Sequence, residues 1–349
     1  MDLTSWLIYN LILFLSVSFA FLSNRTKHKK VFILLSYLSI VIFTSIRYDV
    51  GWDYIPYVEA FGVIKDYGVY YFEFGYLILN KLFAFSPIGY IGVFAVMSAL
   101  TYYFLFKALL RENILASGLY FAFTFQLVFM ANNQIRAGLV VAFFIYALKF
   151  IEREQYLKYI LSIIIIGILF HTSAIFLLSV IFISKLNLKH YIWIVLILVS
   201  YILYLFNFFS NIASYILSHI PFYEKFSNNF REEAQPTTHV LIVTFWVLIS
   251  ILIAFSIKNI KREKITNIYL FGSVLYPVFV DFHIFNRFIL YFTFTNILVL
   301  GLIVKDKKKT GILLILLFYF LFTIYCLKNW GLDGGYPYKT IFSEKIIRF

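Results

Sequence analysis

The chain has 349 residues, of which 62% are hydrophobic and 22% aromatic, while only 13% are charged. Soluble proteins carry roughly a quarter charged residues, so this composition excludes a soluble globular enzyme and a disordered chain. The net charge of +13 is typical of basic inner loops in a membrane protein, and we expect no nucleic-acid partner. The single cysteine, Cys326, excludes an internal disulfide framework and any CxxC metal or redox site.

Long apolar runs follow one another along the chain and predict membrane-spanning helices. The first run, Thr4–Leu22, is preceded by no Lys or Arg, so we interpret it as a retained helix with an outside N-terminus. The later runs are Val31–Ile46, Ile88–Leu110, Leu115–Ala131, Ala137–Ile151, Tyr159–Ile183, Tyr191–Phe208, His239–Ile257, Ile265–Asp281, Asn286–Val304 and Gly311–Leu327. They predict an all-α polytopic membrane protein with about 11–12 hydrophobic helical segments.

The segments between these runs predict the exposed parts of the protein. Residues 47–87 are too polar and aromatic to span and predict one longer outer loop. Residues 209–238 predict a second outer loop, and residues 328–349 an outer C-terminal tail. Because no linker divides the chain, we expect residues 1–349 to form a single integral membrane domain.

The run from Tyr159 to Ile183 is interrupted at its centre by His171, Thr172 and Ser173. We predict a short hairpin over residues 159–184 with His171 at its outer tip. This split places six loops inside, and they hold 19 of the 30 Lys and Arg residues but only five of the 17 acids. That asymmetry agrees with the positive-inside rule.

With this topology, unusual polar residues collect at the outer face. Charged groups near a bilayer core are costly, so their clustering indicates a polar cavity with a function. Structural explanations remain open: an arginine ending a helix can bind lipid phosphate, a lone histidine can be a core residue, and acids can pair with lysines. The candidates are Arg47, Asp53, Tyr57, Glu73, Asn132, Asn133, Gln134, Arg136, His171, Asp281, His283, Asn286 and Arg287.

These residue types favour an anionic lipid substrate. Several arginines facing one cavity can grip phosphate oxygens bidentately, and a nearby histidine or carboxylate can accept a hydroxyl proton. The sequence contains no Walker loop, GxGxxG, HExxH or GxSxG motif, so we expect a lipid-activated donor rather than a nucleotide. We expect no cofactor and no catalytic metal, because the scattered acids form no recognisable metal site.

At these residues the chain resembles the EpsG family of bacterial membrane proteins, which are relatives of the Wzy polysaccharide (O-antigen) polymerases. The matching elements, in chain order, are Arg47-x3-Gly51-x-Asp53-x3-Tyr57, Glu73-x-Gly75-Tyr76, Ile135-Arg136 and Phe170-His171-Thr172-Ser173-Ala174, with a looser match at Asn286-Arg287-Phe288. The family usually has glutamine after the arginine of the third element, whereas this chain has Ala137.

The resemblance implies a glycosyltransferase that joins oligosaccharide repeat units carried on undecaprenyl diphosphate. It acts at the outer face of the bacterial cytoplasmic (inner) membrane and makes O-antigen, capsule or exopolysaccharide. We predict that Arg136 and Arg287 bind the diphosphate, with Arg47 either assisting them or holding the outer loop, and that Tyr57 and Asn286 also contact substrate. His171 is the first candidate for the base, with Asp53 or Glu73 as rivals. The implied partners are the lipid-linked oligosaccharides, membrane lipids, and a chain-length regulator and flippase of the same pathway.

Three other functions are weighed against this one. A lipid-linked oligosaccharide transporter or flippase would need charges through the membrane depth or pseudo-repeated halves. A membrane O-acyltransferase using His171 would leave the outer arginines unexplained. An O-antigen ligase shares the substrate chemistry, and only the family resemblance separates it from a polymerase. The sequence does not specify the sugars, the linkage or the oligomeric state.

Overall fold

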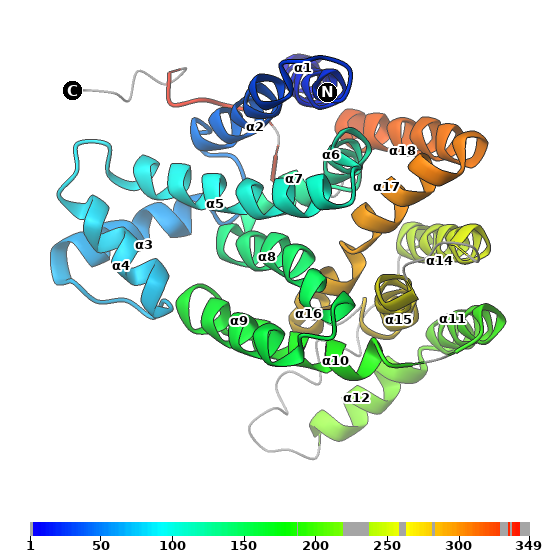
Figure 1. Cartoon of the computed structure of the whole chain (residues 1–349). Coiled ribbons are helices and arrows are strands. Elements are labelled where there is room, and N and C mark those ends of the chain that lie inside the picture. Colours follow the sequence, from blue (N-terminus) through cyan, green and yellow to red (C-terminus); the bar gives the residue numbers. More distant parts are fainter. Residues whose placement is uncertain are drawn as a thin grey trace. The chain divides into compact units, whose positions relative to one another are not determined.

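The computed structural model describes residues 3–186, 188–218, 237–257, 263–280, 283–328, 334–335 and 337–342. These residues form helices and connections with no strand (Figure 1). One isolated β-bridge joins Arg47 to Thr340. The expected all-α class is therefore confirmed. Contacts divide the chain into two compact units, Met1–Leu178 with Leu300–Phe349 and Ser179–Val299. The single-domain interpretation stays a prediction.

Among the described residues, five helices are long and apolar enough to cross a membrane, and one bent helix pair is a sixth candidate. Shorter apolar helices occupy the predicted runs Tyr159–Ile183 and Tyr191–Phe208, and a further one, Phe74–Ala84, lies within the predicted outer loop 47–87. Several apolar helices in one chain agree with a multi-pass membrane protein. The five candidate spans are Leu3–Ser23, Gly89–Arg111, Val240–Ile257, Phe288–Asp306 and Lys308–Leu327, and the bent pair is Leu115–Thr124 with Leu127–Asn133.

The first unit is built around helices whose side chains are buried on nearly every face. Within it, α1 packs on α2 and α6, α2 on α5, and α5 on α8. Helix α7 is buried along its whole length, and α8 along most of it. The helices that lie wholly in this unit are α1 (Leu3–Ser23), α2 (Lys29–Ser45), α3 (Tyr54–Tyr67), α4 (Phe74–Ala84), α5 (Gly89–Arg111), α6 (Leu115–Thr124), α7 (Leu127–Asn133), α8 (Ile135–Glu152), α9 (Tyr156–Leu169) and α18 (Lys308–Lys328).

The second unit is also helical in its described residues. In it α11 packs on α14 and α15, and α15 packs on α16. The 3-10 helix η1 (Thr172–Ser179) and helix α17 (Asn296–Asp306) each cross a boundary between the units. Helices wholly within this unit are α10 (Val180–Ile183), α11 (His190–Leu205), α12 (Phe208–Ser218), α14 (Thr237–Ile257), α15 (Glu263–Phe279) and α16 (His283–Thr293). The predicted outer loop 209–238 lies largely outside the described residues.

Helix α1 exposes a stripe of large apolar side chains. Leu7, Leu11 and Phe14 are each more than half exposed and follow the spacing of one helix face. A continuous exposed apolar stripe is unfavourable in water, and in a bilayer it contacts lipid chains as apolar as itself. This stripe supports the assignment of α1 as a lipid-facing span.

The polar segment 47–87 is more ordered than the predicted loop. It contains α3 and α4, which pack on each other, and α4 also packs on α5 and α9 (Figure 1). Helix α3 buries Tyr54, Tyr57, Phe61 and Ile64 on one face, a helical spacing. It ends at Gly68, which adopts the left-handed conformation (φ +74°) that favours glycine. The segment therefore presents fixed side chains.

The predicted run Leu115–Ala131 is not one helix. Helices α6 and α7 meet at an angle of 61°, and Gln126 at the break has a φ of +66°. A left-handed residue cannot continue a right-handed helix, which explains the bend. Broken helices of this kind survive in membranes only where protein buries the freed backbone groups, and α7 is buried throughout.

The predicted break at His171 is confirmed. Helix α9 ends at Leu169 and η1 begins at Thr172. After the break the chain turns back toward α9 at least as far as Leu177, whose carbonyl oxygen accepts a hydrogen bond from the Tyr159 hydroxyl at 2.8 Å.

The topology of this hairpin predicts a labelling pattern. On a Cys326→Ser background, Thr238→Cys should react with an impermeant maleimide in intact, outer-permeabilised cells, whereas Lys189→Cys should not. The reason is that a hairpin over 159–184 returns the chain to the inner face before residue 189. Labelling at Lys189 without labelling at Thr238 would contradict the hairpin, and labelling of both after full permeabilisation is the control.

Candidate functional site

Arg47 lies buried where α2 ends, with 1% of its surface exposed. Its guanidinium donates hydrogen bonds to the Thr44 carbonyl oxygen and, at 2.9 Å, to the Asn132 carbonyl oxygen. The ring of Phe94 lies 4.7 Å from its central carbon. Arg47 thus links α2 to α7, which matches the alternative that it holds the outer segment. Its predicted role in substrate binding stays a prediction.

The connection from Arg47 to α3 is fixed against the end of α7. Gly51 has a φ of +103°, and a Cβ atom there would lie 3.1 Å from the Cα of Asn133. Two residues later, the backbone N–H of Asp53 donates to Asn133 Oδ1 at 2.8 Å. Glycine is therefore required for both the backbone conformation and the close approach. These contacts place Asp53 at the start of α3.

The C-terminal segment strengthens the same region. The backbone N–H of Tyr48 donates to the Lys339 carbonyl oxygen, and that of Ile341 donates to the Ile46 carbonyl oxygen, both at 2.9 Å. The ring of Tyr338 stacks on Phe43 with centroids 4.5 Å apart. Residues 337–342 therefore pack along the segment that carries Arg47.

Glu73 is the centre of the candidate site. One carboxylate oxygen pairs with the guanidinium of Arg136, and the other lies 3.2 Å from Nδ1 of His171. The backbone N–H of Thr172 donates to that second oxygen at 3.1 Å. The side chains of Glu73, Arg136 and His171 remain 11%, 19% and 16% exposed. We call these three residues the Glu73 cluster.

Three different segments deliver the Glu73 cluster. Glu73 precedes the first residue of α4, Arg136 lies in the first turn of α8, and His171 occupies the break after α9. A cation in the first turn opposes the helix dipole, so the carboxylate of Glu73 stabilises a position that would otherwise be unfavourable. The arrangement brings together three of the predicted site residues.

Aromatic rings surround the guanidinium of Arg136. Its central carbon lies 4.5 Å from the ring centroid of Phe72, 5.7 Å from that of Tyr76 and 5.9 Å from that of Tyr57. Cation–π attraction at these distances contributes roughly 0.5–2 kcal/mol, more as the site loses water. Tyr57 is buried beside Arg136, and its predicted contact with substrate stays a prediction.

Gly75 allows α4 to reach α9. A Cβ atom at Gly75 would lie 2.7 Å from the carbonyl oxygen of Leu169, closer than real Cβ contacts. Leu169 ends α9, immediately before the break that holds His171. The absence of a side chain at Gly75 therefore brings Glu73 within reach of His171.

Replacing Gly75 with alanine should separate these helices. We expect a destabilisation of about 1–3 kcal/mol, the usual cost of overpacking, together with reduced activity. The measurement is thermal unfolding of the purified protein in detergent, alongside its activity. Gly62→Ala on α3 is the matched control, because a Cβ there meets nothing within 4 Å. Equal effects of the two substitutions would contradict this account of Gly75.

The environment of Glu73 keeps it ionised. Burial by itself would raise the pKa of its carboxyl, but the hydrogen bond with His171 and the charge of Arg136 outweigh burial and lower that pKa to about 2. A carboxylate with so low a pKa is a weak base at neutral pH. Its geometry favours a role in holding Arg136 and His171 over the role of rival base.

The geometry places His171 better than Glu73 for the predicted role of base. When His171 Nδ1 carries the proton and donates a hydrogen bond to Glu73, Nε2 is left as a hydrogen-bond acceptor. A carboxylate that fixes a histidine tautomer in this way is a recurring arrangement in enzymes. Among the described residues no group of three or more His, Cys, Asp or Glu side chains is positioned to hold a metal ion.

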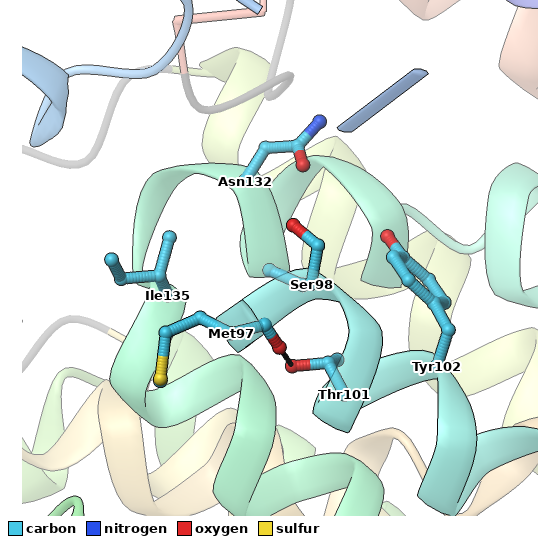
Figure 2. A pocket seen from close by; sticks show the side chains of 7 residues that line it. Met97, Ser98, Thr101, Tyr102, Asn132 and Ile135 are labelled. Atoms are coloured by element: carbon cyan, nitrogen blue, oxygen red, sulfur yellow. Dashed lines mark hydrogen bonds between the residues drawn. The ribbon is translucent and has the colours of Figure 1, made fainter. Parts of the chain in front are cut away.

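A narrow pocket lies beside this region, between α5 and the junction of α7 and α8. Its volume, including space open to solvent, is about 190 Å³. Figure 2 shows the Asn132, Ser98 and Tyr102 side chains around it. The Thr101 hydroxyl donates a hydrogen bond to the Met97 carbonyl oxygen at 2.8 Å. No residue of the Glu73 cluster lines it, so it is separate from that cluster. The lining residues are Met97, Ser98, Thr101, Tyr102, Ala131, Asn132 and Ile135.

The structure does not describe the side chains of two predicted site residues in α16. Asn286 and Arg287 lie in α16, in the second unit, and their side chains are outside what the structure describes. Asp281 also falls outside the described residues. The predicted binding of diphosphate by Arg287 and of substrate by Asn286 therefore stays a prediction.

The structure adds residues that the sequence did not single out. Phe72 and Tyr76 support Arg136, and Asn133 holds the start of α3 through Asp53. Phe72 directly precedes Glu73 in the chain, and the helical spacing of the aromatic residues in 54–64 was a usable signal for α3. No sequence signal pairs Phe72 with Arg136.

Comparison with known proteins adds one finding. Residues 30–340 match the model of the EpsG family, which spans most of the chain and includes the whole Glu73 cluster. No curated protein and no solved structure shows significant similarity to the chain.

Proposed function

We propose that this chain, which belongs to the EpsG family, is a polysaccharide polymerase of the Wzy type that joins repeat units carried on undecaprenyl diphosphate. Family membership supports the general activity, a glycosyltransferase-like polymerase in a multi-pass membrane protein. The proposal goes further in naming the lipid diphosphate donor and the outer face of the cytoplasmic membrane. The product is a long-chain O-antigen, capsule or exopolysaccharide.

The observation that carries the proposal is the Glu73 cluster itself. Arg136 and His171 Nδ1 both pair with the carboxylate of Glu73, which leaves His171 Nε2 as an acceptor, and all three side chains are partly exposed. This combination supplies a cation for a leaving group and a base for an attacking hydroxyl. A polymerase that uses a lipid diphosphate donor needs both.

The reaction can be written on these groups. The acceptor hydroxyl oxygen attacks the anomeric carbon of the donor sugar, and the bond from that carbon to the diphosphate oxygen breaks. His171 takes the hydroxyl proton at Nε2, while undecaprenyl diphosphate departs with the bonding electrons. Arg136 stabilises the negative charge that grows on the diphosphate, an interaction stronger in the transition state than in the bound substrate.

Charge distribution supports action at the outer face. The six predicted inner loops hold most of the Lys and Arg residues, and the Glu73 cluster lies on segments assigned to the opposite side. Nucleotide sugars are absent outside the cell membrane, which agrees with the absence of a nucleotide motif in this chain.

Deleting the gene tests the proposed function. Single repeat units should remain on the terminal acceptor, and the long-chain ladder should vanish from gels of the surface polysaccharide. A normal ladder in the deletion strain would overturn the polymerase proposal. Loss of single units from the outer face would favour the flippase instead, and complementation with the wild-type gene is the control.

A further inference from the structure

A row of aromatic rings runs from the surface of the protein to Arg136. Tyr71 is fully exposed, and its ring centroid lies 6.3 Å from that of Tyr70, which is 39% exposed. The centroid of Tyr70 lies 4.4 Å from that of Phe72, which in turn covers the guanidinium of Arg136 at 4.5 Å. We call Tyr70, Tyr71 and Phe72 the aromatic row.

The aromatic row lies on the connection between α3 and α4, next to charged residues. Lys65 and Asp66, in the last turn of α3, are both exposed. Exposed side chains of positive and negative charge avoid the hydrocarbon core of a membrane, so this end of α3 faces water or the polar headgroup region. The rings of Tyr70 and Tyr71 are therefore accessible to a water-soluble group.

Tyrosine suits one kind of ligand at such a place. Its ring offers a flat apolar face and its hydroxyl a hydrogen-bonding edge. A pyranose has the complementary character, with a face of C–H groups and a rim of hydroxyls. A purely apolar ligand would gain nothing from the tyrosine hydroxyls.

The position of the row decides which sugar it would meet. Resting on the proposed function, Arg136 holds the diphosphate of a lipid-linked donor, and the first sugar is bonded directly to that diphosphate. A glycan leaving Arg136 toward water encounters Phe72, then Tyr70 and Tyr71. We propose that the aromatic row is a glycan subsite that binds the sugars next to the donor diphosphate by stacking on Tyr70 and Tyr71.

The test uses two probes on the purified protein in nanodiscs. One is the lipid-free repeat-unit oligosaccharide, released by mild acid from the host's lipid-linked units, and the other is undecaprenyl diphosphate without sugar. Tyr71→Leu should weaken oligosaccharide binding about tenfold and change undecaprenyl diphosphate binding less than about twofold. Arg136→Ala should show the reverse pattern, and Tyr71→Phe should keep the stacking face and bind the oligosaccharide nearly as the wild type does.

Tyr191→Leu is the matched control, because Tyr191 is also an exposed tyrosine (61%) but lies on α11 outside the aromatic row. Unchanged oligosaccharide affinity in Tyr71→Leu would overturn the subsite. Equal loss of both probes in Tyr71→Leu and Tyr191→Leu would also overturn it and assign these tyrosines to the membrane interface. If the wild type makes the long-chain ladder while Tyr71→Leu binds the oligosaccharide normally, the subsite proposal is wrong and the polymerase proposal is retained. A wild type that binds neither probe and makes no ladder contradicts both proposals.

Discussion

Replacing Glu73 with glutamine is expected to lower the polymerisation rate about 10²- to 10⁴-fold, the range that a positioned acid–base group contributes. The substitution keeps the size of the side chain but removes the negative charge shared by Arg136 and His171. The amide no longer selects the His171 tautomer with the proton on Nδ1, and it no longer neutralises Arg136. The measurement is the initial rate with purified lipid-linked repeat units at matched protein abundance.

Glu59→Gln is the control for this substitution, since Glu59 is an exposed glutamate on neighbouring α3. It should leave the rate unchanged. A Glu73→Gln protein with a rate near that of the wild type would remove Glu73 from the mechanism and leave it as a structural ion pair.

The same residue predicts how stability depends on pH. The pKa of Glu73 is lowered from 4.5 to about 2 in the folded protein. A carboxyl whose pKa is lowered by folding stabilises the folded protein fully at a pH above its pKa in the unfolded chain. This stabilisation is lost as the pH falls through its pKa in the folded protein. The unfolding temperature of the wild type should therefore exceed that of Glu73→Gln at neutral pH, and the two should converge as the pH falls from about 4.5 toward about 2. A difference that stays constant over this range would contradict the ionised Glu73.

Replacing Arg136 with lysine is expected to slow polymerisation roughly 30- to 150-fold, the equivalent of one charge-assisted hydrogen bond of about 2–3 kcal/mol. Lysine keeps the positive charge but loses the planar fork that grips two phosphate oxygens. It also loses the flat face that packs at 4.5 Å on Phe72. Arg136→Ala should be slower still, because it leaves the partly buried carboxylate of Glu73 without its cation.

The control for Arg136→Lys is Arg25→Lys, an exposed arginine in a predicted inner loop, which should retain the wild-type rate. If Arg136→Lys is nearly as active as the wild type, the bidentate grip on the diphosphate is wrong. Full activity of both Arg136→Lys and Arg136→Ala would exclude Arg136 from the site.

The amino-acid sequence alone determined the class of the protein and the place of its main interruption. Apolar runs and the distribution of Lys and Arg are properties of the chain read in order, so they predict helices and orientation without tertiary contacts. The polar residues His171, Thr172 and Ser173 indicated the break in the same way, because three consecutive polar side chains are unfavourable in the middle of an apolar membrane segment. The family resemblance, carried by short motifs around Arg47, Glu73, Arg136 and His171, was likewise visible in the sequence and agrees with the family match.

Only the tertiary structure decided which candidates meet. Glu73 lies 63 residues from Arg136 and 98 from His171, and their meeting depends on how closely α4 approaches α9 at Gly75. The same packing buries Arg47 against backbone carbonyls and places the ring of Tyr57 beside Arg136. Hydrophobic pattern specifies which face of a helix is buried but not which neighbour covers it, because that choice is made by shape and close contact between distant segments.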